Sequence, residues 1–178
     1  MGVMLSRILL ATTLFLLPAS ALWAAESATA TVKTVDAKGV GADLGKITFA
    51  ESKWGLLITP DLSGLPPGAH GFHIHAKAQC GPAQHEGKME AGFAAGGHLD
   101  PLKSGKHLGP YADGHAGDLP PLIVGADGKA TTPVLAPRLT LKDVRGHSVM
   151  IHAGGDNYSD QPKPLGGGGA RIACGAIE

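Results

Sequence analysis

The sequence predicts an all-β protein, an antiparallel sandwich or barrel, from three observations. Glycine accounts for 27 of the 178 residues, yet apolar residues still make up 43%, which suits a packed core with many tight turns better than a disordered chain. Short segments of alternating polar and apolar residues are separated by turn sequences, such as those at 64–68 and 126–128. Beyond residue 25, no stretch keeps an apolar helical pattern over three turns.

Eight segments have the character of strands. They are 30–35, 44–50, 55–62, 69–75, 122–124, 129–134, 148–152 and 171–177. The first three alternate apolar and polar residues, the fourth follows the turn at 64–68, and the next two flank the turn at 126–128. The last two are short apolar runs, the first of which ends on a histidine.

Two intervening segments, 76–97 and 98–121, lack strand character and are too long for simple hairpin loops. Long ordered loops of this kind are usually functional. We find no internal repeat and no domain boundary in the chain after residue 25, so the sequence predicts one domain over 26–178.

The first 25 residues have the layout of a secretory signal peptide. A single positive charge, Arg7, precedes an apolar run over 8–17, and Pro18 and small residues follow. A membrane anchor is the alternative, but an apolar run of about ten residues is too short for a bilayer core that needs ~20. We expect cleavage between Ala21 and Glu26 and no membrane anchor afterwards.

Charge and cysteine content agree with an exported protein that binds no nucleic acid. Lys and Arg number 15, as do Asp and Glu, so the bulk positive charge of a nucleic-acid binder is missing. Cys80 and Cys174 are the only cysteines, and an oxidising compartment favours one disulfide between them. Two separate buried thiols are the alternative.

Two groups of histidines predict metal sites. On a strand, His73 and His75 lie on one face about 6.6 Å apart, close enough to converge on one metal, although surface histidines would show the same pattern. His98, His107, His115 and Asp118 lie within 21 residues of a loop rich in Gly and Pro. Three imidazoles and one carboxylate form the closed set that a structural zinc requires, and the alternative is a solvated polar loop.

Six motifs in this order resemble the bacterial copper, zinc superoxide dismutases. They are 71–75 (GFHIH), 96–101 (GGHLDP), 107–110 (HLGP), 114–120 (GHAGDLP), 150–157 (MIHAGGDN) and 169–175 (GARIACG). The match runs through most of residues 30–177. The resemblance implies a flattened Greek-key β-barrel of eight strands, with two long functional loops and both metals held outside the barrel.

The resemblance also implies the two ligand sets and the reaction. Copper would be bound by His73, His75, His98 and His152, and zinc by His98, His107, His115 and Asp118. Four nitrogen ligands suit Cu(II), and three imidazoles with a carboxylate suit Zn(II). The implied activity is dismutation of superoxide to oxygen and hydrogen peroxide by redox cycling of copper, with His98 bridging the metals and carrying a proton.

Further roles follow from the same resemblance. Arg171 corresponds to the arginine that guides the anion to copper, and Asp156 to the aspartate that joins a copper histidine to a zinc histidine. Relatives from bacteria imply a periplasmic location and either a monomer or a homodimer. Eukaryotic members of the family have a longer charged loop after the last copper histidine, whereas here only residues 153–170 separate His152 from Arg171. We therefore expect substrate steering to come from elsewhere, and Lys77 is the candidate.

Some residues and functions are set aside. We expect three histidines not to be ligands. His70 has the opposite strand parity to His73 and His75, His85 lies in the loop after Cys80, and His147 precedes a strand. A copper-buffering protein of the same fold without turnover is the competing function. A zinc hydrolase is less favoured, since no carboxylate stands out as a general base beside an open metal position.

Overall fold

The computed structural model describes residues 26–178, and the predicted signal peptide at 1–25 lies outside the described residues. The strands are β1 (Ser27–Asp36), β2 (Gly39–Ser52), β3 (Gly55–Ser63), β4 (Gly68–His70), β5 (Phe72–His75), β6 (Ala83–His85), β7 (Lys88–Glu90), β8 (Leu122–Val124), β9 (Lys129–Ala130), β10 (Val134–Ala136), β11 (Ser148–His152) and β12 (Arg171–Ala176). The helical turns are η1 (Phe93–Ala95), α1 (Leu141–Val144) and η2 (Leu165–Gly167).

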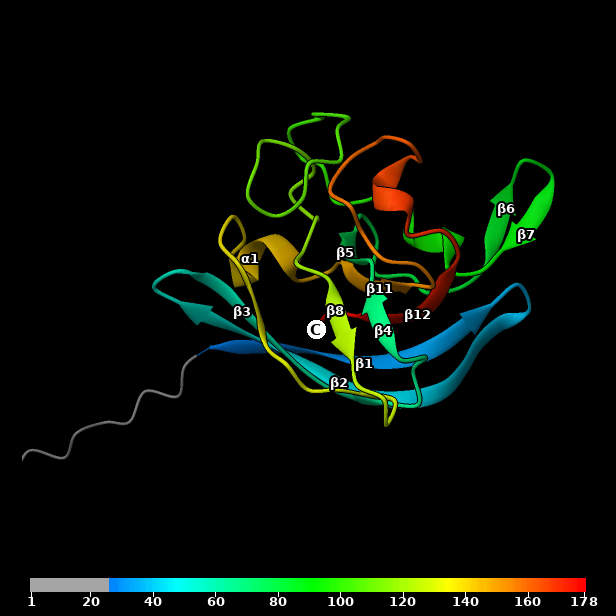
Figure 1. The fold of residues 1–178 in the computed structure, drawn as a ribbon, viewed down its shortest axis with the longest axis horizontal. Coiled ribbons are helices and arrows are strands. Elements are labelled where there is room, and N and C mark those ends of the chain that lie inside the picture. The colour runs from blue at the N-terminus through cyan, green and yellow to red at the C-terminus, as the bar shows by residue number, and fades with distance from the viewer. Residues whose placement is uncertain (1–25) are drawn as a thin grey trace, which may run out of the picture.

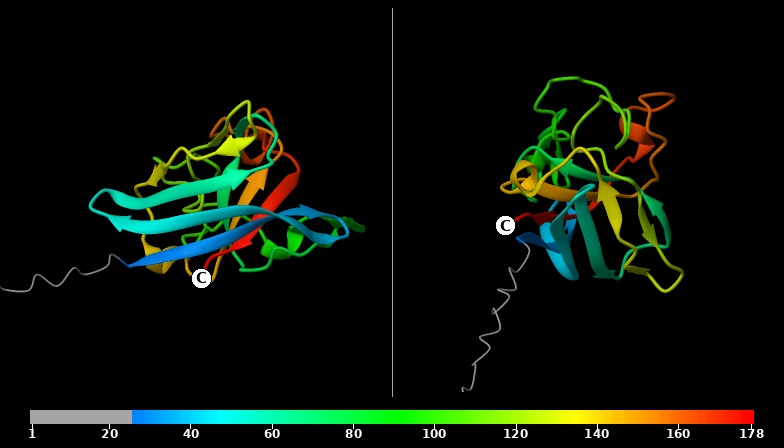
Figure 2. Two further views of the ribbon diagram at one scale, coloured as in Figure 1. Left: turned by 90° about the horizontal axis from the view of Figure 1, so that it is seen from below. Right: turned by 90° about the vertical axis from the view of Figure 1, so that its left-hand side faces the viewer.

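The main sheet has eight strands, which confirms the predicted all-β class and barrel architecture. Its order is β10-β3-β2-β1-β12-β11-β5, with β9 also paired to β3, and every pairing is antiparallel. The last strand, β12, returns to lie beside the first, the long-range return typical of Greek-key topology. The long strands β1, β2 and β3 curl around one side, and the loops gather on the other (Figures 1 and 2).

The structure corrects three details of the predicted strands. The segment 69–75 is two strands, because β4 pairs with β8 whereas β5 pairs with β11. The segment 129–134 is likewise divided, and the break contains Pro133, which has no N–H for a ladder. The segment 76–97 contains a small hairpin, β6–β7, which turns at two residues of positive φ, Glu86 and Gly87.

The core explains why β5 presents its histidines on one face. Phe72 and Ile74 belong to the main hydrophobic cluster together with residues of β1, β2 and β3, so alternation places His73 and His75 on the opposite face. All four residues of β5 are buried. The face that carries the histidines is therefore covered, and the two long loops near β5 in Figure 1 provide the cover.

A disulfide joins Cys80 to Cys174, across 94 residues of sequence, which confirms the predicted pairing. It links the segment before β6 to β12 and packs in a small cluster with Met150 and Ala95. The segment that precedes η1 is thereby fixed next to Arg171 at the start of β12.

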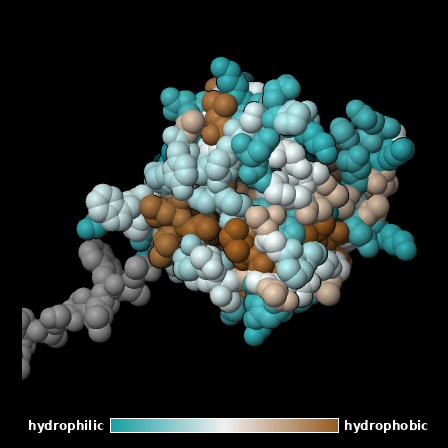
Figure 3. Space-filling view, in the orientation of Figure 1, coloured by the Kyte–Doolittle hydropathy of each residue, from teal (hydrophilic) through white to brown (hydrophobic). Residues whose placement is uncertain are grey.

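The surface differs between the loops and the barrel. On the face seen in Figure 3, hydrophilic residues dominate over the long loops and the β6–β7 hairpin, whereas apolar residues form a band across the middle. Within residues 26–178, no helix is both long enough and apolar enough to cross a membrane.

Candidate metal centre

Backbone pairing brings the loop ligands to the edge of β5. Ile74 donates its N–H to the carbonyl of Gly117, and Leu99 donates its N–H to the carbonyl of Ile74, both at 2.8 Å. His75 therefore lies opposite His98, and His73 opposite Asp118. Two positions more than 20 residues away in sequence become neighbours of the strand, because the backbone of the 98–121 segment continues the ladder of β5.

Four histidines form the first candidate metal group. One nitrogen from each of His73, His75, His98 and His152 lies within 4.8 Å of the others, and all four residues are buried. His152 ends β11, where an irregularity in the pairing with β12 follows Ile151 and turns the last side chain out of the regular register. These are the four residues predicted for copper.

Hydrogen bonds fix which nitrogen of each ring is available to a metal. His75 and His152 face the carbonyls of Gly96 and Gly169 through Nδ1, at 2.8 and 3.1 Å. A carbonyl oxygen only accepts, so each Nδ1 carries the proton and each Nε2 keeps its lone pair. His73 donates Nε2–H to Asp156 at 2.7 Å, which leaves the lone pair on Nδ1.

The remaining nitrogens fit a metal-binding role. Each of the six predicted ligand histidines has one buried nitrogen without an aligned hydrogen-bond partner: His73 Nδ1, His75 Nε2, His98 Nε2, His107 Nδ1, His115 Nδ1 and His152 Nε2. Buried polar atoms are normally satisfied. Unpaired nitrogens that converge are the donors that copper and zinc prefer, so the residues present fit both metals.

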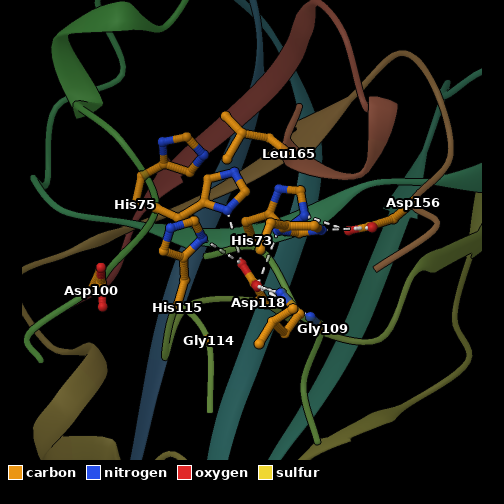
Figure 4. Close-up of polar contacts among 12 residues, drawn as sticks. His73, His75, Asp100, Gly109, Gly114, His115, Asp118, Asp156 and Leu165 are labelled. Carbon is orange, nitrogen blue, oxygen red and sulfur yellow. Dashed lines mark hydrogen bonds and ion pairs between the residues drawn. The ribbon is translucent and has the colours of Figure 1, made fainter. Parts of the chain in front are cut away.

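The second candidate group surrounds Asp118. Its Oδ1 lies 2.9 Å from His98 Nδ1 and 3.4 Å from His115 Nδ1, and its Oδ2 lies 3.0 Å from His107 Nδ1. Figure 4 shows Asp118 next to His115, with dashed lines from the Asp118 carboxylate to neighbouring nitrogens. The atoms that are all mutually close belong to His73, His98, His107 and Asp118. His73 joins this set because its ring stacks on His98 with centroids 4.0 Å apart. The predicted ligand His115 is not in the set, although its Nδ1 lies near the Asp118 carboxylate.

Asp156 connects the two groups. Its Oδ2 accepts from His73 Nε2 at 2.7 Å, and its Oδ1 accepts from His107 Nε2 at 2.8 Å. One carboxylate thus orients a histidine of each group and sets the tautomer of both rings. This is the position that the resemblance implied for Asp156.

The electrostatics of the two groups differ. Burial lowers the pKa of His73 to about 3 and that of His152 to about 4, with the neighbouring His98 adding to the effect. Burial also lowers the pKa of His107, but contacts with Asp118 and Asp156 outweigh burial and raise that pKa to about 9. The first group is thus neutral and electron-donating, whereas the carboxylates of the second stabilise positive charge, as a site for a cation requires.

An open cavity of about 550 Å³ leads to the first group. It is lined by His98, His152 and Arg171, and also by Phe93, Leu165 and Glu90. Arg171 donates hydrogen bonds to the carbonyls of Gly92 and Gly96, both at 2.8 Å, and its guanidinium lies over the Phe93 ring at 4.9 Å. The positively charged guanidinium of Arg171 is therefore held in one place in the cavity that His98 and His152 line.

Comparison with known proteins identifies the family. The family model described as "Copper/zinc superoxide dismutase (SODC)" matches residues 44–177. The chain belongs to the copper/zinc superoxide dismutase family. The Escherichia coli K12 protein named "Superoxide dismutase [Cu-Zn]" is 57% identical over 145 residues, which cover 81% of this chain and 84% of that protein.

Solved structures of the family agree. The copper/zinc superoxide dismutase from Brucella abortus is 47% identical, with a TM-score of 0.84, and the match covers 86% of this chain and all of that one. The monomeric enzyme from Salmonella enterica is 55% identical, with a TM-score of 0.77 over 86% of this chain and all of that one.

Three histidines of this family member lie outside both groups. His85 stacks on Phe93, and His147 directs Nδ1 to the carbonyl of Ala76. His70 is buried, with Nδ1 2.7 Å from the carbonyl of His152 and Nε2 2.8 Å from that of Pro66. None of the three belongs to a metal-binding group among the described residues.

Sequence reasoning missed the residues that support Arg171 and the loops. Phe93 and the Gly92 carbonyl lie in a segment with no recognisable strand pattern, so their contact with Arg171 emerges only in three dimensions. Asp160 also went unrecognised, although it is the next acidic residue after Asp156. The predicted steering residue Lys77 is exposed just beyond β5 and does not line the cavity.

Proposed function

We propose that this chain dismutates superoxide to oxygen and hydrogen peroxide, with copper held by His73, His75, His98 and His152. Zinc would be held by His98, His107, His115 and Asp118, which makes His98 a member of both ligand sets. The observation that carries the proposal is the convergence of four unpaired imidazole nitrogens beside an open cavity that contains Arg171. Copper supplies one-electron redox chemistry there, and zinc does not change oxidation state.

The protein's own residues bind the anion and manage the proton. The Arg171 guanidinium offers hydrogen bonds to a small anion in the cavity, and its contacts with Gly92 and Gly96 hold it in place. His98 presents Nε2 to the copper group and Nδ1 to Asp118. We assign His98 Nε2 as the atom that would hold a proton whenever it is not bound to copper, and from which that proton could pass to an anion beside Arg171.

The test is superoxide consumption by the purified chain loaded with copper and zinc. We expect fast, copper-dependent turnover that is abolished in His152→Ala and weakened in Arg171→Ala. His147→Ala is the matched control, because His147 lies outside both groups, and it should retain activity. Stoichiometric binding of both metals without turnover would instead support the competing metal-buffering function.

Export and assembly are parts of the same proposal. The layout of residues 1–25 and the bacterial relatives support a signal peptide, cleavage before residue 26 and a periplasmic location for the 26–178 domain. A homodimer is an alternative to the monomeric state named for the Salmonella enterica relative. N-terminal sequencing of protein from a periplasmic fraction tests the first point, and sedimentation of the metal-loaded chain tests the second.

A further inference from the structure

Asp160 joins the backbone of two segments near the metal centre, one at His107 and one at Leu165. It belongs to the connection between β11 and β12. Its Oδ2 accepts the backbone N–H of His107 at 3.0 Å, and its Oδ1 accepts the backbone N–H of Leu165 at 3.2 Å. Both hydrogen bonds keep the pKa of Asp160 below its usual value, so both oxygens act as charged acceptors at neutral pH.

One end of this bridge fixes the backbone of a proposed zinc ligand. The His107 ring is held by Asp156 at 2.8 Å, while its N–H is held by Asp160. The next two N–H groups, of Leu108 and Gly109, point to Asp118 Oδ2 at 3.3 Å. Without Asp160, the first of three successive donors loses its acceptor and the start of this turn is free to shift.

The other end fixes part of the cavity wall. Leu165 has a φ of +54°, a left-handed conformation that a leucine adopts only when its surroundings hold it there. Leu165 lines the cavity that contains His98, His152 and Arg171. The hydrogen bond to Asp160 is the contact that holds its N–H.

We propose that Asp160 is a positioning residue that ties the backbone of His107 to Leu165, so that one carboxylate sets both zinc retention and the shape of the copper cavity. The inference rests on the proposed function for the metal assignments. Other contacts between the two segments remain when Asp160 is removed. Asp156 still bonds the His107 ring, and the Tyr158 ring still packs against Gly109.

The experiment compares Asp160→Ala with Asp100→Ala in the full chain loaded with copper and zinc. Asp100 is the matched control, because it also accepts backbone N–H groups, but only those of Ser104 and Gly105 in its own turn. Two readouts are measured: the rate of zinc release to the chelator 4-(2-pyridylazo)resorcinol, and the azide dissociation constant from the Cu(II) absorption spectrum.

We expect Asp160→Ala to release zinc about tenfold faster, the factor that loss of one charge-assisted hydrogen bond typically produces. The azide dissociation constant should shift by about threefold or more, and Asp100→Ala should stay within about twofold in both readouts. In a Leu165→Ala background the N–H···Asp160 hydrogen bond remains, but the side chain that it positions in the cavity wall is missing. Asp160→Ala should therefore no longer shift azide binding in that background.

Asp160→Asn keeps the side-chain shape and serves if the alanine variant does not fold. An amide has only one acceptor oxygen, so it can satisfy His107 or Leu165 but not both, and at least one readout should shift in the same direction. The proposal is overturned if Asp160→Ala changes only one readout or matches Asp100→Ala. Neither readout depends on turnover, so a chain that holds both metals but consumes no superoxide refutes the proposed function without deciding the role of Asp160.

Discussion

The Nε2 of His107 lies 2.8 Å from Asp156 Oδ1, and both groups are fully buried. The other oxygen of Asp156 bonds His73. A single carboxylate therefore determines which nitrogen each ring can offer to a metal.

Replacing Asp156 by alanine should weaken zinc binding by about 10- to 100-fold, the usual cost of losing a partner that orients a metal-ligating histidine. The ring of His107 would then be free to rotate or to change tautomer. Competition with a zinc chelator measures the affinity, and Asp100→Ala is the control. Unchanged zinc affinity in Asp156→Ala would show that the His107 ring is oriented by other contacts.

Gly166 and Gly169 offer a matched test of the space around Asp156. Both have positive φ, of 72° and 68°, so alanine costs a similar backbone strain at either position, about 1 kcal/mol. A Cβ on Gly166 would lie 2.0 Å from Asp156 Oδ1, whereas a Cβ on Gly169 meets nothing within 4 Å. Gly166→Ala should therefore lose zinc affinity and Gly169→Ala should keep it. Equal zinc affinities would contradict the close approach.

Removing the disulfide should destabilise the barrel. The bond closes a loop of 94 residues, and we expect Cys80→Ser combined with Cys174→Ser to lower the free energy of unfolding by about 2–5 kcal/mol. Urea unfolding of the metal-free protein measures this, with and without reductant for the wild type. An unchanged midpoint would mean that the core holds the segment before β6 unaided.

The metal-free protein should be most stable near the ordinary pKa of histidine, 6.5. His73 and His152 have pKa values lowered to about 3 and 4 in the fold, so the unfolded chain binds more protons below pH 6.5 and stability falls as the pH drops. His107 has its pKa raised to about 9, so its contribution is complete below pH 6.5 and is lost as the pH rises towards 9.

Thermal unfolding midpoints across this pH range test the prediction. His107→Gln removes the group with the raised pKa and should flatten the alkaline side while leaving the acid side in place. A wild-type midpoint that keeps rising to pH 9 would show that His107 is not protonated in the metal-free fold.

Lys77 is predicted to steer superoxide by its charge. Lys77→Ala should slow turnover and reduce the dependence of the rate on ionic strength, since steering falls with salt. Lys129→Ala is the control, because Lys129 lies in β9, which pairs with β3, and four strands separate β3 from β5 in the order of the main sheet. If both the rate and its salt dependence stay at the wild-type values in Lys77→Ala, steering comes from other charges.

The sequence alone predicted the fold class and favoured the disulfide, and its ordered motifs indicated the candidate ligands through the family resemblance. Alternation in 71–75 puts His73 and His75 on one face whatever the rest of the fold does. The dense group from His98 to Asp118 and the ordered motifs are equally local. Two cysteines allow only one pairing within the chain.

Only the tertiary structure decided how these residues act together. Three contacts join residues that are distant in sequence: the ladder between β5 and the 98–121 segment, the stacking of His73 on His98, and the hydrogen bond from His107 to Asp160. His107 and Asp160 are 53 positions apart. The division of 69–75 into β4 and β5 depends on which strand each half pairs with. Such contacts depend on how distant segments of the chain pair and pack in the folded protein. No local pattern in the sequence encodes that arrangement.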